Sequence, residues 1–93
     1  MDIESPREII GGLVPEYPRT AEIAGIQGKV TISVDVSEEG KAFGVKVTST
    51  SGHIELDYAA QVAAETLVFA PDSNNEVSAI QIVVNFSLGN PAQ

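Results

Sequence analysis

The sequence has no cysteine, no tryptophan and a single histidine, His53, among its 93 residues. Without cysteine there is neither disulfide nor thiol chemistry, and His53 has no second histidine or thiolate with which to bind zinc. A triad of His53, Asp57 and a serine can be drawn, but both residues stand at the entrance of a predicted helix as ordinary loop and first-turn residues. We therefore expect no catalytic residue, no metal site, no cofactor and no enzymatic activity.

Basic residues are also scarce: five Lys and Arg stand against 13 Asp and Glu, a net charge of −8. Binding to nucleic acid depends on Lys and Arg at the phosphates, so a nucleic-acid partner is not expected. Attachment to an anionic membrane surface needs the same residues and is not expected either.

Long apolar runs are missing, because no stretch approaches the roughly 20 residues of a membrane-spanning helix. Met1 is followed by Asp-Ile-Glu-Ser-Pro, so no signal peptide is expected. If the natural protein is anchored or exported, the segment responsible lies outside this sequence. The length fits one domain. We expect residues 1–14 to be an extended arm or linker remnant, and residues 15–93 to be the domain.

Charge is absent from the final stretch, since Val77 to Gln93 contains no Lys, Arg, Asp or Glu. Apolar and other residues alternate in it, which predicts a strand buried on one face. The inward set is Ile80, Ile82, Val84, Phe86 and Leu88. A long uncharged strand must be paired, covered or used, because bare edges invite association.

The preceding chain predicts two helices around a hairpin. The first helix, Arg19 to Ala24, ends with Gly25 in the left-handed conformation and Ile26 folding back onto it. The expected later elements are a strand at 29–36, a strand at 42–50, and a helix from 54 or 55 to about 68 that ends before Pro71.

The hairpin register follows from placing all apolar residues on one side. Val30, Ile32, Val34 and Val36 alternate along the first strand. On the second strand Phe43, Val45 and Val47 form the apolar face. We therefore expect Val34 opposite Phe43, Ile32 opposite Val45 and Val30 opposite Val47.

A helix between two strands of one sheet usually makes a right-handed crossover. The predicted fold is therefore α+β, in the order α-β-β-α-β, with a three-stranded antiparallel sheet of order 2-1-3 covered by helices on one face. Both outer strands are edges. The second carries Lys46 and Gly44, which discourage pairing, whereas the last carries neither. The open edge is predicted at Ile80–Phe86, unless the N-terminal arm or a second copy caps it.

An ordered series of motifs across residues 15 to 88 resembles the C-terminal domain of TonB, the energy transducer. The matching pieces are Tyr17-Pro18-x-x-Ala21, Gly25-Ile26-x-Gly28-x-Val30, Val36, Gly40-Lys41, Val45-x-Val47, Ser49-x-Ser51-Gly52-His53-x-x-Leu56-Asp57-x-Ala59-Ala60, Phe69-x-Pro71 and Val84-x-Phe86-x-Leu88.

The resemblance implies a periplasmic domain at the end of a linker that an N-terminal helix, absent from this sequence, anchors in the inner membrane. There the family works with a proton-driven motor complex. It binds the TonB box of outer-membrane transporters for iron chelates and vitamin B12 by adding a strand to its last strand. On this sequence the implied partner-binding residues are Tyr17, Pro18, Ile80, Gln81, Ile82, Val83, Val84, Asn85 and Phe86.

Two features differ from the usual family pattern. Thr66-Leu67-Val68-Phe69 stands where an aromatic and a basic residue are common, and the domain is acidic where relatives are often basic. An alternative is therefore an envelope interaction module of the same fold with a non-transporter partner or with itself as a homodimer. For Tyr17, a structural role in pinning the first helix stands beside partner contact.

Overall fold

The computed structural model describes residues 2–12, 15–71 and 77–88. Four strands form one antiparallel sheet in the order β1-β6-β3-β4, and β2 pairs with β5 in a second, two-stranded sheet. The elements are β1 (Asp2–Glu4), β2 (Ile9–Gly11), α1 (Arg19–Ala24), β3 (Gly28–Val36), β4 (Ala42–Ser49), α2 (Ile54–Ala64), β5 (Val68–Phe69) and β6 (Ser78–Phe86).

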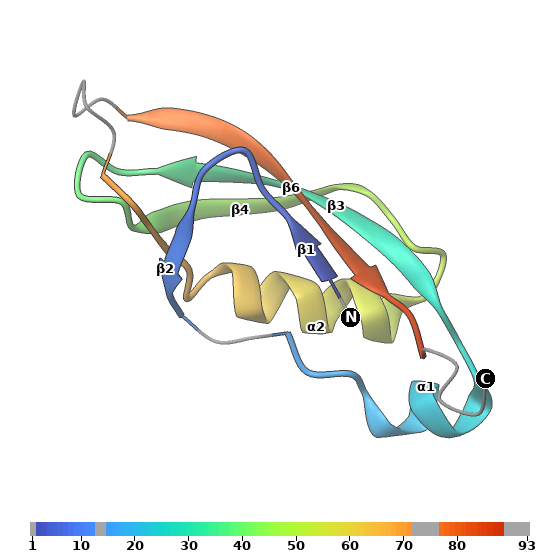
Figure 1. Cartoon of the computed structure of the whole chain (residues 1–93). Helices are drawn as coiled ribbons and strands as arrows, with labels where there is room; N and C mark the ends of the chain where they lie inside the picture. The colour runs from blue at the N-terminus through green and yellow to red at the C-terminus, as the bar shows by residue number, and fades with distance from the viewer. Residues whose placement is uncertain (1, 13–14, 72–76, 89–93) are drawn as a thin grey trace.

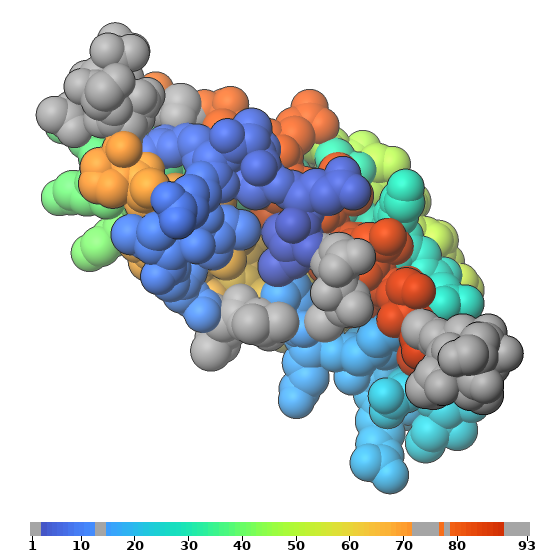
Figure 2. Space-filling model, in the orientation of Figure 1, coloured from blue at the N-terminus to red at the C-terminus, as the bar shows by residue number. Residues whose placement is uncertain are grey.

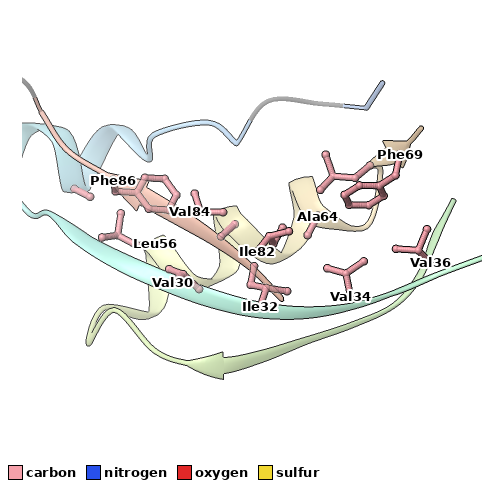
Figure 3. Close-up of a cluster of buried hydrophobic side chains, with 13 residues drawn as sticks. Val30, Ile32, Val34, Val36, Leu56, Ala64, Phe69, Ile82, Val84 and Phe86 are labelled. Carbon is pink, nitrogen blue, oxygen red and sulfur yellow. The ribbon is translucent and has the colours of Figure 1, made fainter. Parts of the chain in front are cut away.

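The predicted three-stranded arrangement is confirmed in β4, β3 and β6. β6 is antiparallel to β3 along nine residues, from Gly28 opposite Phe86 to Val36 opposite Ser78. α2 lies across one face of this sheet (Figure 1). The buried side chains of β3 and β6 point toward α2, where Leu56 and Ala64 meet them (Figure 3). The fold is therefore two layers around one apolar core.

The helix α1 begins and ends where the sequence predicts. Gly25 has φ of 72°, a conformation that glycine adopts without steric cost. The Gly25 N–H donates to the Glu22 carbonyl (3.2 Å) and the Ile26 N–H to the Ala21 carbonyl (2.9 Å). These two bonds form a Schellman motif, which turns the chain into β3.

The predicted hairpin register is wrong by two residues. Val34 lies opposite Val45 and Ile32 opposite Val47, with irregularities at both ends of the ladder. Phe43 is the extra residue between Gly44 and Ala42, and it is 62% exposed. A bulge of this kind changes which face later side chains occupy, so simple alternation placed Phe43 inward incorrectly.

The predicted end of α2 is also wrong. The helix stops at Ala64, and Val68–Phe69 forms the short strand β5. The Phe69 N–H donates to the Gly40 carbonyl (2.6 Å), and the Ala42 N–H donates to the Leu67 carbonyl (3.1 Å). These bonds to the β3–β4 turn replace the helical ones, so tertiary contacts override helix propensity here.

The segment expected to be an arm packs on the domain in two places. β1 pairs with β6, and β2 pairs with β5. β1 is thus a fourth strand, which caps the β6 edge as in the alternative that the sequence left open. The boundary expected between residues 14 and 15 stays a prediction.

Candidate partner-binding edge

The strand β6 presents two different faces. Ile82, Val84 and Phe86 are each 1% exposed and belong to the core, whereas Gln81 is exposed. Val83 and Asn85 are half-buried on the outward side. The inward side chains hold the strand in place and leave the backbone along the edge as the part that can bind another strand.

β1 covers one half of the β6 edge. Glu4 lies opposite Val83, Ile3 opposite Val84 and Asp2 opposite Asn85. Ile3 also packs against the core cluster. In Figure 2 the blue arm lies directly against the orange and red surface of β6. The edge predicted to be open is therefore closed at residues 83–85.

The other half of this edge is different. Within the ranges that the structure describes, no strand pairs with residues 78–82 on the side opposite β3. Ile80 is only half-buried, in contrast to Ile82. Backbone groups that pair with no described strand and a partly exposed apolar side chain thus lie together on this half.

The N-terminal arm is also held by hydrogen bonds that follow β1 in the chain. The Arg7 guanidinium donates to the Ala70 carbonyl (2.5 Å), and the Ala70 N–H donates to the Glu8 carbonyl (2.8 Å). Between this anchor and β1, the Ser5 hydroxyl donates to the Arg7 carbonyl (2.7 Å) and accepts from the Arg7 N–H (3.2 Å). The arm thus turns at Ser5–Arg7 and is held separately on each side of the turn.

Tyr17 reaches the end of β6. Its ring meets that of Phe86 edge-on, with centroids 5.3 Å apart. Its hydroxyl donates to the Ile26 carbonyl. Burial and the neighbouring Glu22 carboxylate raise the pKa of Tyr17. The structural role considered for Tyr17 is therefore present, and a role in partner contact stays a prediction.

Pro18 faces elsewhere. It lines a surface hollow with Glu16 and five residues of α2, of which Tyr58 is 69% exposed. The structure therefore brings Tyr17 together with β6 but places Pro18 against α2.

Asp57, considered for a triad, supports the loop before α2. It accepts bonds from the Thr50 hydroxyl, the Ser51 N–H (2.9 Å) and the Ser51 hydroxyl (2.8 Å). Burial alone would raise the pKa of the Asp57 carboxyl, but these bonds outweigh it and lower that pKa. His53 precedes the helix and accepts from the Ser51 hydroxyl through its backbone carbonyl. His53, Asp57 and Ser51 therefore shape the turn that leads into α2.

The described residues offer neither a metal site nor a membrane-spanning helix. In the described ranges, no three His, Cys, Asp or Glu side chains are grouped so that they could hold a metal ion. Neither described helix has the length and apolarity needed to cross a membrane.

The profile of the family described as Gram-negative bacterial TonB protein C-terminal matches residues 14–88, most of the chain. This chain belongs to the TonB C-terminal domain family. It is 38% identical over 77 residues to Protein TonB of Xanthomonas campestris pv. campestris, covering 80% of this chain. Over 44 residues, 47% of this chain, it is 48% identical to Protein TonB of Haemophilus influenzae. The chain spans 34% and 16% of those two proteins, so it corresponds to part of each.

Solved TonB C-terminal domains share the fold. The solution structure of the Pseudomonas aeruginosa domain superposes with a TM-score of 0.69 at 22% identity, covering 96% of this chain and 89% of that one. The Helicobacter pylori domain gives 0.68 at 27% identity, with 82% and 71% covered. The α+β arrangement predicted from sequence is therefore that of the TonB domain.

Sequence reasoning offered capping of the β6 edge by the N-terminal arm only as an alternative and did not identify the strand β1. Its only local signal is Ile3 between Asp2 and Glu4, one period of alternation. Three residues are too short a window for periodicity to identify a strand.

Proposed function

We propose that this TonB domain binds the TonB box of outer-membrane transporters by strand addition along β6. It thereby transmits proton-motive energy from the inner membrane for the uptake of iron chelates or vitamin B12. In this proposal the domain works in the periplasm, joined to an inner-membrane anchor and motor complex by segments outside this sequence.

The observation that carries the proposal is the half of the β6 edge at residues 78–82. On that side no described strand pairs with it, and Ile80 is only partly covered. An extended peptide would complete the backbone hydrogen bonds and cover Ile80. Strand addition takes its affinity from main-chain bonds and its specificity from alternate side chains, here Gln81, Val83 and Asn85.

A strand on this edge would also join the mechanically continuous part of the domain. β6 pairs with β3 along its whole length, and Ile82 and Val84 are fixed in the core. Pulling on the domain would therefore load a ladder of backbone bonds rather than single side-chain contacts.

The test is a titration of the 15N-labelled chain with TonB-box peptides, followed by amide NMR. We expect the largest shifts at residues 80–86. Strand β4 is the internal control, because it is the opposite edge of the same sheet. A matched peptide with proline at alternate positions has lost N–H donors and is expected not to bind.

Shifts centred on β4, or none with any box peptide, would contradict the proposal. Equal binding of the proline-substituted peptide would contradict strand addition specifically.

A further inference from the structure

We propose that β1 is an intramolecular substitute for a partner strand. It occupies residues 83–85 of β6, and an extended partner segment binds first at residues 78–82 and then displaces β1. This inference rests on the proposed function, because it concerns how a partner reaches the same edge.

The geometry shows what β1 replaces. Ile3 lies opposite Val84 and packs against the core cluster. It therefore covers apolar surface and satisfies edge backbone groups, the two tasks of an added strand. Two strands cannot use one edge at the same residues, so β1 and a partner along the full length of β6 are mutually exclusive.

β1 is short enough to detach easily. It has three residues, and a short strand with few buried contacts opens at low free-energy cost. Beyond the turn at Ser5–Arg7, the arm keeps its own anchor through Glu8, Ala70 and the β2–β5 pairing. β1 can therefore detach without unfolding the rest of the arm, and it stays close enough to return.

The half of the β6 edge at residues 78–82, with which no described strand pairs, is where the partner would bind first. A partner paired with residues 78–82 gains backbone bonds and covers Ile80 before β1 has moved. Each further residue pairing toward Phe86 replaces one contact of β1, so opening proceeds stepwise. The same contacts favour β1 when no partner is present, which protects the edge from association with other chains.

A disulfide can lock β1 in place. Glu4 is exposed, Val83 is half-buried, and the two are directly opposite in an antiparallel pair. Such residues have Cα atoms about 4.5–5.5 Å apart, within the range that a disulfide bridges. The chain has no cysteine, so Glu4→Cys with Val83→Cys gives one defined pair, and its reduced form is the matched control.

The opposite change weakens β1. Ile3→Ala removes its core contact, and the same substitution at Ile10, 57% exposed in β2, is the control. Binding of a TonB-box peptide is measured by calorimetry and amide NMR for all forms. If β1 is docked in about nine molecules of ten, Ile3→Ala binds about tenfold tighter than the unmodified chain. Ile10→Ala is expected to bind as the unmodified chain does. The oxidised double variant is expected to bind far more weakly than its own reduced form, which carries the same Val83→Cys change.

The outcomes separate the two proposals. If the oxidised and reduced forms bind equally at β6, the displacement of β1 is wrong and strand addition stands. If no form binds any box peptide, Ile3→Ala included, the proposed function is wrong and this inference falls with it.

Discussion

The ring of Tyr17 meets the ring of Phe86 edge-on, with centroids 5.3 Å apart and planes at 89°. Edge-to-face aromatic pairs contribute about 0.5–1.5 kcal/mol beyond their buried area. The Tyr17 hydroxyl also donates to the Ile26 carbonyl. One side chain thus joins the approach to α1, the turn after α1 and the last residue of β6, which fixes the end of the candidate edge.

Tyr17→Phe separates the two contacts of this side chain. It keeps the ring pair and removes the hydrogen bond to the Ile26 carbonyl. We expect the free energy of unfolding to fall by about 1 kcal/mol, typical of a lost hydrogen bond, in urea denaturation. Tyr58→Phe is the control, since Tyr58 is 69% exposed, and its effect should be within about 0.5 kcal/mol. Equal effects at the two tyrosines would show that the Ile26 bond does not stabilise the fold.

Asp57 should make stability depend on acidity. Its pKa in the folded chain is lowered from an ordinary value near 3.9. The ionised carboxylate therefore stabilises the fold above about pH 4, and this contribution disappears as pH falls through the folded-state pKa. Asp57→Asn is expected to lower stability at neutral pH and to flatten the loss of stability on acidification.

The measurement for Asp57 is the urea midpoint between pH 7 and pH 2.5. Glu55→Gln removes a carboxyl from the same helix turn and is the matched control. Parallel pH profiles for Asp57→Asn and the unmodified chain would rule out the stabilising role.

Phe43 tests the bulge in the hairpin. Because it is 62% exposed, Phe43→Ala should change the free energy of unfolding by less than about 0.5 kcal/mol. Phe69 is fully buried, and Phe69→Ala should cost about 3–5 kcal/mol. If Phe43→Ala lowered the free energy of unfolding as much as Phe69→Ala does, Phe43 would be buried, as the register expected from alternation requires.

Sequence reasoning succeeded where one local rule decides the structure. The ends of α1 follow from Gly25 and Ile26, and the inward face of β6 follows from period-two alternation over several residues. The order of the three main strands follows from crossover handedness. Each of these signals is contained in a short window or in the order of elements.

Sequence reasoning failed where segments far apart in the chain determine the hydrogen bonding. Nothing near Phe43 marks an extra residue in the β3–β4 ladder. Nothing near Val68 indicates that Gly40 and β2 would pair with the chain after Ala64. At the candidate site, sequence located β6 but offered capping by the N-terminal arm only as an alternative, because a three-residue strand exists only through its partner about 80 residues later.

β6 is the last strand of the domain to be synthesised, yet it lies between β1 and β3 in the sheet. While the ribosome makes the chain, β1 and β3 emerge first and have no strand between them. The four-stranded sheet can be completed only after residues 78–86 are released, because β6 joins β1 to β3. Pairings between such distant residues form slowly, and until they form β3 has no strand on the side that β6 occupies. Until residues 78–86 are available, the β3 edge therefore stays unpaired and open to association with other chains.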